Sequence, residues 1–154
     1  MDSTALARKH LERRLAPLRG RQDLMRPPHG WLRAIRDALG MTTRQLAQRM
    51  GKVQSAIVDL EKSEARETVS LAKLREAAAA MDCTLVYALV PNRPIDEILR
   101  ARAEEMAELQ LARASHTMAL ENQGLDQPAL ADERERLVDE LLRGSITRLW
   151  DDKP

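Results

Sequence analysis

The chain is poor in aromatic residues and in cysteine. Of its 154 residues two are tryptophan, one is tyrosine, none is phenylalanine, and Cys83 is the single thiol. So few aromatic and β-branched side chains argue against a β-sandwich or barrel and favour helices. One cysteine excludes an internal disulfide and a cysteine-rich zinc site, and it suits a reducing compartment. We therefore expect an all-α protein with a cytoplasmic location.

Long apolar runs and catalytic constellations are also missing. The longest apolar stretch, 85–90, is far too short to cross a membrane. The three histidines, His10, His29 and His116, lack the spacing of metal ligands. We find neither a glycine-rich phosphate loop nor a nucleophile with its base. We expect no enzyme activity, no catalytic residues, no metal site, no cofactor and no membrane contact.

The charged residues are distributed unevenly along a chain whose formal net charge is only +1. The net charge is +6 over residues 1–36, zero over 37–92 and −5 over 93–154. A basic first part suits a polyanion such as double-stranded DNA, and an acidic last part suits a different partner. The alternative is that both parts only carry solvated helix faces.

Apolar spacing predicts a series of helices. They cover residues 3–18, 31–39, 43–50, 54–62, 71–81, 95–121 and 128–150. Glycines end the second and third of them, and a short connection joins the last two into a C-terminal helical hairpin. We divide the chain into a basic N-terminal helix and linker (1–29), a helical domain (30–92) and a C-terminal partner-binding region (93–154).

Residues 83–90 depart from the helical pattern. They form a run of β-branched and apolar residues that Pro91 ends, which predicts one short β-strand. No second strand is predicted in the chain, so the backbone groups of this strand need a partner. The same strand of a second copy would supply one, in a two-stranded antiparallel ribbon across the axis of a homodimer. The alternative is an extended segment packed on its own helices.

The most specific pattern lies within 40–62. Thr42 is placed to cap a helix, Gly51 supplies a tight turn, and the small Ala47 suits a close crossing of two helices. The second of these helices then turns a polar face outward. This face consists of Gln54, Ser55, Val58, Asp59 and Lys62. The arrangement is typical of a helix-turn-helix, whose second helix enters the major groove of DNA.

Residues 30–82 resemble the Cro/repressor helix-turn-helix family. The resemblance implies that Gln54 reads a base, and glutamine pairs well with adenine. It also implies phosphate contacts by Thr43, Arg44, Lys52 and Lys62, which add affinity without sequence information. The alternative is a helical core of this type that does not bind DNA.

Two residues of this segment depart from that family. Val53 stands where the family usually has a capping serine, so the second helix lacks its ordinary N-cap. Asp59 stands where a basic or polar residue is common. Its carboxylate would either accept a hydrogen bond from a cytosine amino group or pair with a neighbouring cation.

A wider resemblance rests on residues 26–36, 82–91 and 116–121. These strings resemble the family called mobile mystery protein A, whose members are encoded beside a Fic-domain protein, mobile mystery protein B. The resemblance implies a regulator that is paired with a Fic enzyme, which transfers a nucleotide onto protein hydroxyl groups.

The segment 117–122 also resembles the short signature of Fic inhibitors, a serine or threonine followed after three residues by Glu and then by Gly or Asn. Here these positions hold Thr117, Glu121 and Asn122. Thr117 and Glu121 share a helix face, and the negative end of a helix disfavours a carboxylate there, a local conflict of the kind found at functional positions. By resemblance Glu121 would pair with the Fic arginine that holds the ATP γ-phosphate. The alternative is an ordinary solvated glutamate.

Together these patterns predict a sequence-specific DNA-binding repressor that autoregulates its operon and acts as the antitoxin, or inhibitor, of a Fic-domain nucleotidyltransferase. Two alternatives belong to other classes: a stand-alone transcriptional regulator, and a protein-interaction inhibitor that does not bind DNA.

Overall fold

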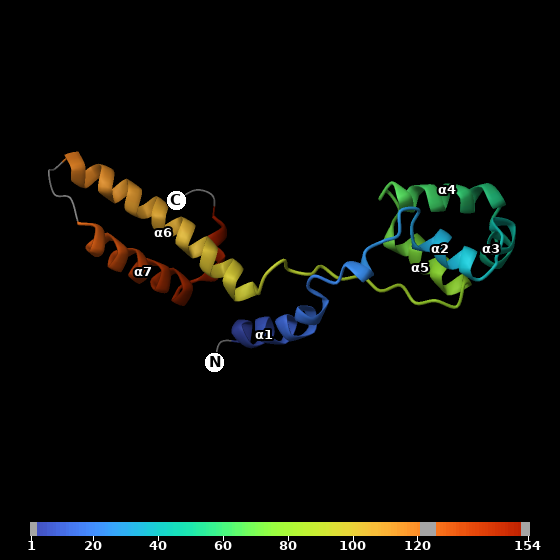
Figure 1. Ribbon diagram of the computed structural model, residues 1–154, viewed down its shortest axis with the longest axis horizontal. Coiled ribbons are helices and arrows are strands. Elements are labelled where there is room, and N and C mark those ends of the chain that lie inside the picture. The colour runs from blue at the N-terminus through green and yellow to red at the C-terminus, as the bar shows by residue number, and fades with distance from the viewer. Residues whose placement is uncertain (1–2, 121–125, 152–154) are drawn as a thin grey trace. The chain divides into compact units, whose positions relative to one another are not determined.

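The computed structural model describes residues 3–120 and 126–151, with side chains 118–120 left aside. Every regular element in these ranges is helical, which confirms the all-α class (Figure 1). The α-helices are α1 (Ser3–Leu15), α2 (Trp31–Ala38), α3 (Thr43–Met50), α4 (Gln54–Ala65), α5 (Leu71–Ala80), α6 (Ile95–Leu120) and α7 (Gln127–Arg143). Three short 3-10 helices are η1 (Ala16–Leu18), η2 (Gln22–Leu24) and η3 (Ile146–Trp150).

The helices form two compact units. One consists of Gly20–Leu89 and contains α2 to α5, and the other combines Met1–Arg19 with Val90–Pro154. The second unit therefore groups α1 with α6 and α7. The division predicted from the sequence, at residues 29 and 92, places α1 in a separate segment instead.

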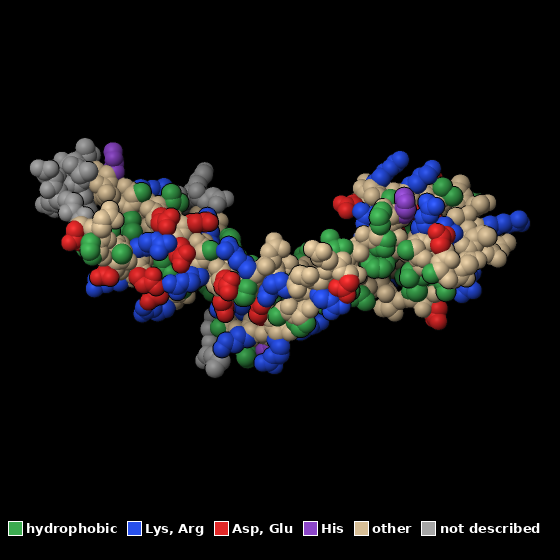
Figure 2. Space-filling model, in the orientation of Figure 1, with side chains coloured by type: hydrophobic (Ala, Val, Ile, Leu, Met, Phe, Trp, Pro, Cys, Tyr) green, Lys and Arg blue, Asp and Glu red, His purple; other side chains and the backbone are tan. Residues whose placement is uncertain are grey.

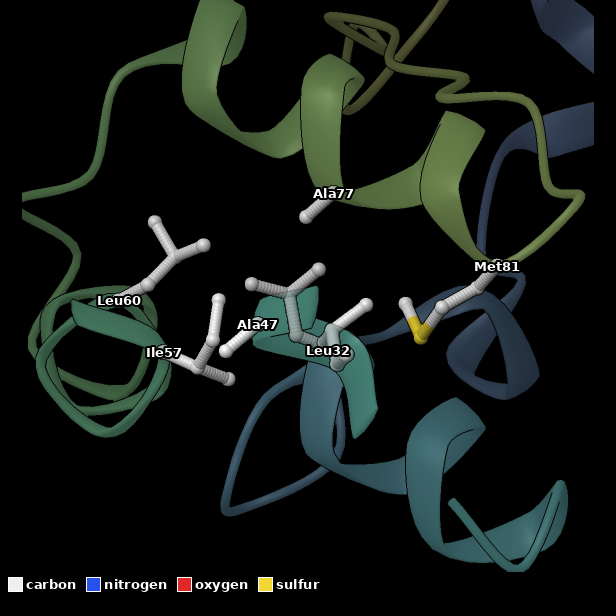
Figure 3. Close-up of a cluster of buried hydrophobic side chains, with 7 residues drawn as sticks. Leu32, Ala47, Ile57, Leu60, Ala77 and Met81 are labelled. Carbon is white, nitrogen blue, oxygen red and sulfur yellow. The ribbon is translucent and has the colours of Figure 1, made fainter. Parts of the chain in front are cut away.

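The first unit is built around a core to which all four of its α-helices contribute (Figure 3). Its buried residues are Leu32, Leu46, Ala47, Ile57, Leu60, Ala77 and Met81. Ala47 of α3 lies beside Ile57 of α4, as expected for a small residue where two helices cross closely. Burial of each large aliphatic side chain contributes about 1.5–3 kcal/mol, so this core fixes the mutual placement of α3 and α4.

The ends of these helices follow the local sequence. The Thr42 hydroxyl accepts a hydrogen bond from the Gln45 backbone N–H at 3.1 Å, and the Gln45 side chain accepts one from the Thr42 N–H at 2.8 Å. This capping box satisfies two backbone donors at the start of α3. Gly51 ends α3 with φ at 65°, in the left-handed region that favours glycine. Ser70 caps α5, where its hydroxyl accepts a hydrogen bond from the Lys73 N–H at 3.3 Å.

The second unit contains the predicted helical hairpin of α6 and α7 (Figure 1). Its core consists of Leu99, Ala103, Ala107, Val138 and Leu149. The two alanines on α6 are fully buried, and such small side chains let α7 approach closely. Ion pairs lie outside this core, where Arg100 contacts Glu135 at 2.6 Å and Arg134 contacts Glu108 at 3.0 Å.

The last helix is shorter than predicted. α7 ends at Arg143 rather than continuing to 150, because Gly144 adopts an extended conformation. The chain then forms η3, which places Leu149 fully within the α6–α7 core. The Leu149 carbonyl accepts a hydrogen bond from Arg102 Nε at 2.6 Å. The apolar stripe that suggested a continuous helix thus marks burial correctly but overstates the helix length.

Helix α1 is attached to the beginning of α6. Glu12 accepts a hydrogen bond from the Ile95 N–H at 3.1 Å and pairs with Arg19 at 2.7 Å, while Arg8 pairs with Asp96 at 2.7 Å. The hydrogen bond from Arg19, followed by that from Ile95, lowers the pKa of the Glu12 carboxyl below its ordinary value. Glu12 therefore serves as the N-terminal cap that α6 does not find in its own sequence.

The segment 83–90 connects α5 to α6 and is extended rather than helical (Figure 1). The Cys83 N–H donates to the Ala78 carbonyl at 2.8 Å, and Cys83 packs against the core of the first unit. A single chain does not test the strand across a dimer, so the predicted ribbon stays a prediction.

Candidate nucleic-acid interface

Helices α3 and α4 meet at a three-residue turn. Gly51, Lys52 and Val53 connect them, and the Lys52 N–H donates to the Ala47 carbonyl at 2.9 Å. Val53 precedes α4 and makes no side-chain cap, as its departure from the family pattern predicted. The Ala56 N–H donates to the Val53 carbonyl at 3.1 Å, and within the described residues no side chain caps the start of α4. The N–H groups of Gln54 and Ser55 at such a helix start suit an anionic group.

The predicted outer face of α4 is exposed, apart from Val58, which is half-buried. Gln54, the first residue of α4, donates from Nε2 to Thr43 Oγ1 at 2.9 Å, which joins the first residues of the two helices. This bond uses one of the two Nε2 hydrogens. The second hydrogen and Oε1 remain, and these are the donor and the acceptor that a bidentate contact with adenine requires.

The predicted phosphate-binding cations differ in their surroundings. Within the described residues Arg44 and Lys62 form no ion pair, whereas Lys52 Nζ lies 3.3 Å from Glu76 of α5. Arg44 and Lys62 can therefore approach a phosphate without losing a partner, and Lys52 would exchange a carboxylate for it. Asp59 is exposed and forms no ion pair within the described residues, and both readings of this carboxylate stay predictions.

Sequence reasoning missed a buried carboxylate that supports this interface. Glu64 of α4 is 4% exposed and accepts hydrogen bonds from the backbone N–H groups of Trp31 at 2.8 Å and Leu32 at 2.9 Å. It thereby caps α2, whose own N-cap residue Gly30 has no side chain. A Cβ at Gly30 would lie 2.5 Å from Glu64 Oε2, and φ there is 89°. The one available signal was a helix preceded by glycine with no polar cap.

A buried ion pair was missed as well. Arg36 of α2 donates from Nε and Nη2 to Glu61 of α4 at 2.5 and 3.2 Å, and from Nη1 to the Met41 carbonyl at 2.8 Å. The hydrogen bonds that Arg36 donates to Glu61 raise the pKa of Arg36 above its ordinary value. Glu61 and Glu64 thus attach the inner face of α4 to α2, which fixes the direction in which the outer face points.

The sites predicted elsewhere are only partly described. Thr117 is exposed on α6, and its hydroxyl donates to the Arg113 carbonyl at 3.1 Å. Glu121 and Asn122 lie outside the described residues. Over 3–120 and 126–151 we find no group of acidic, histidine and cysteine side chains that could hold a metal. None of the described helices is long and apolar enough to cross a membrane.

Figure 2 shows charged side chains of both signs on both units. Lys and Arg side chains project from the α2–α5 unit with acidic ones between them, and acidic and basic side chains alternate over α6 and α7. The basic projections fit a phosphate backbone, and the alternating charges reflect the ion pairs between and along the hairpin helices.

Comparison with known proteins gave one match. Residues 32–87 match the helix-turn-helix family model, a range that begins within α2 and ends in the extended segment after α5. No curated protein and no solved structure matches the chain. The match agrees with the Cro/repressor resemblance, and it bears neither on the mobile mystery families nor on a Fic partner. Helices α2 to α5 form a helix-turn-helix domain, of the kind that DNA-binding regulators of transcription carry.

Proposed function

We propose that this chain is a sequence-specific repressor that binds the operator of its own operon as a homodimer. The observation that supports this most is the environment of Gln54. It is exposed at the first residue of α4, is held by Thr43, and keeps one donor and one acceptor for a base edge. In a helix-turn-helix these N-terminal residues are the ones that reach the base edges.

The contacts divide into two kinds in this proposal. Gln54 reads a base, with Ser55, Val58 and Asp59 beside it on the same face. Arg44, Lys62, Lys52 and Thr43 hold the phosphate backbone and fix the register of α4 in the groove. Two copies related by a two-fold axis would place their α4 helices about 34 Å apart, one turn of duplex, over a near-palindromic operator.

The test is a titration of the full chain against a labelled duplex of its upstream region, followed by fluorescence anisotropy at increasing potassium chloride. We expect a specific affinity that falls with salt, because phosphate contacts release counterions. A shuffled duplex of the same composition is the control. Equal affinity for the two duplexes at every salt concentration would overturn the proposal.

The second part of the proposal concerns a protein partner. We infer that the acidic C-terminal region binds a Fic-domain enzyme, with Thr117, Glu121 and Asn122 at the contact, and that the chain acts as its antitoxin. The support is the match of 117–122 to the Fic-inhibitor signature and the net charge of −5 over 93–154.

This second part is tested by nucleotide transfer with the purified neighbouring enzyme. The chain should suppress transfer, and Glu121→Gly should relieve the suppression while operator binding stays unchanged. Gln123→Gly, two residues away and without a carboxylate, is the matched control. Full suppression by Glu121→Gly would exclude the inhibitory role and leave the repressor proposal standing.

A further inference from the structure

The segment between α5 and α6 presents hydrogen-bonding groups that nothing in the described chain satisfies. From Thr84 to Val90 no backbone N–H or carbonyl has a partner within the described residues. Three apolar side chains in the same segment are strongly exposed: Val86 at 83%, Tyr87 at 66% and Leu89 at 88%. An extended, apolar strand with free edges is a template for another strand.

The charges around this segment identify the orientation of a partner strand. Residues 83–92 contain no charged side chain, while Asp82 precedes them and Arg93 comes directly after them. In an antiparallel pair of two such segments the end of one copy that carries the aspartate lies beside the end of the other copy that carries the arginine. A parallel pair would instead bring like charges together, which is unfavourable.

We propose that the second strand is the same segment of another copy, with the two-fold axis passing at Tyr87. This inference rests on the proposed homodimer and adds its surface and register. A two-fold axis through an antiparallel ribbon brings one residue opposite its own copy, and Tyr87 is the middle residue of 84–90. Leu85 of one copy then lies opposite Leu89 of the other, and Val86 lies opposite Ala88.

This register gathers apolar side chains on each face of the ribbon. Residues at alternate positions point to the same face, so Leu85, Tyr87 and Leu89 of both copies form one apolar cluster. The ribbon would thus pair the free backbone N–H and carbonyl groups of 84–90 and would cover the apolar side chains that the single chain exposes.

The oligomeric state tests the surface. By light scattering after size exclusion we expect a mass of twice 17.4 kDa for the full chain. Leu89→Asp should weaken the dimer at least tenfold, since it places a carboxylate opposite an apolar residue. Leu109→Asp is the matched control, because Leu109 is an exposed leucine of α6 (57%) and should leave the dimer intact. Circular dichroism confirms that both variants retain their helices.

Disulfide trapping tests the register. In a Cys83→Ser background, Tyr87→Cys should cross-link into a covalent dimer under mild oxidation, because residues directly opposite have Cβ atoms about 4.5–5.5 Å apart. Leu89→Cys, which lies opposite Leu85 instead of its own copy, should cross-link at least tenfold more slowly.

Three results would overturn the inference: a monomer at all concentrations, a dimer that Leu89→Asp leaves unchanged, or equal cross-linking at positions 87 and 89. A monomer that still prefers its operator would refute the ribbon and not the repressor. A ribbon dimer without any sequence preference would refute the repressor and not the ribbon.

Discussion

The two units of this chain are held together by different means. The α2–α5 unit packs larger aliphatic residues and adds two carboxylates that attach α4 to α2, the partly buried Glu61 and the buried Glu64. The α6–α7 hairpin buries small alanines along α6 and keeps its ion pairs exposed. Buried hydrogen bonds and ion pairs are stable only in a narrow range of geometries, so they fix how two helices are oriented. Exposed ion pairs add little stability, so the packing of α6 against α7 depends mainly on apolar contacts. The directional contacts thus lie in the unit that forms the helix-turn-helix domain.

The largest expected effect comes from the buried ion pair. Glu61→Ala removes the two hydrogen bonds that Arg36 donates to this carboxylate and leaves Arg36 with Asp37 at 2.8 Å and the Met41 carbonyl. We expect it to lower the free energy of unfolding of the α2–α5 unit by about 2–3 kcal/mol. Urea denaturation followed by tryptophan fluorescence measures this in a Trp150→Phe background, where Trp31 of α2 is the remaining reporter.

The matching change in the hairpin is Glu135→Ala. Its partner Arg100 is about half exposed, so the cost should be at most about 1 kcal/mol. Here Trp150 of η3 reports the transition in a Trp31→Phe background. Similar costs for the two glutamates would contradict the distinction between the units.

Glycine substitutions sharpen the same distinction within the first unit. Gly30 has φ 89° and ψ 163°, a region open essentially only to glycine, and a Cβ there would clash with Glu64. We expect Gly30→Ala to cost about 2 kcal/mol of unfolding free energy. Gly20→Ala is the control, since φ is also positive but nothing lies within 4 Å, and its cost should be clearly smaller. The tryptophan-monitored urea transition of Trp31 again provides the measurement.

The residues proposed to contact DNA should separate recognition from stability. Gln54→Ala should reduce discrimination between operator and shuffled duplex by about 1–3 kcal/mol, because it removes the proposed base contact. Arg44→Ala should weaken both duplexes alike and reduce the salt slope by about one, because it removes a proposed phosphate contact. Anisotropy titrations at several salt concentrations measure both. An equal loss of specificity in the two variants would contradict the assignment of Gln54.

The smallest expected effect concerns the attachment of α1 to α6. The pKa of Glu12 is lower in the folded chain than its ordinary value of 4.5. Its contribution to stability is therefore present above that value and is lost as the pH falls through the lower, folded-state pKa. The protection of the α1 amides against hydrogen exchange, taken relative to the intrinsic exchange rate at each pH, should decrease in acid for the natural chain. In Glu12→Gln this protection should already be lower near neutrality and should change less with pH; identical protection profiles would argue against this cap.

The sequence predicted the local features. Apolar spacing located the seven α-helices of the described residues, and Thr42 and Gly51 marked the correct ends of α3 because caps and turns depend on a few neighbouring residues. The outer face of α4 was predicted by the same periodicity. The error after Arg143 arose because an apolar stripe records burial in a 3-10 turn as readily as in an α-helix.

The contacts that the sequence did not reveal are long-range. Glu64 reaches Leu32 and Glu61 reaches Arg36 between helices that are distant in the chain, and no spacing rule links such positions. The attachment of Glu12 to Ile95 belongs to the same kind. Each contact depends on a packing that exists only after the helices have come together.

The hydrogen bond between Glu12 and Ile95 has a consequence for folding during synthesis and for the design of truncated fragments. Helix α1 precedes the helix-turn-helix domain and contacts the start of α6, which lies beyond that domain in the chain, so the domain is inserted within the other unit. During synthesis α1 must wait for the whole inserted domain to emerge before its capping partner exists. A chain truncated after α5 would keep α1 but lack the α6 residues that α1 contacts. A fragment that starts at Gly20 and ends near Leu89 would instead omit both segments of the second unit.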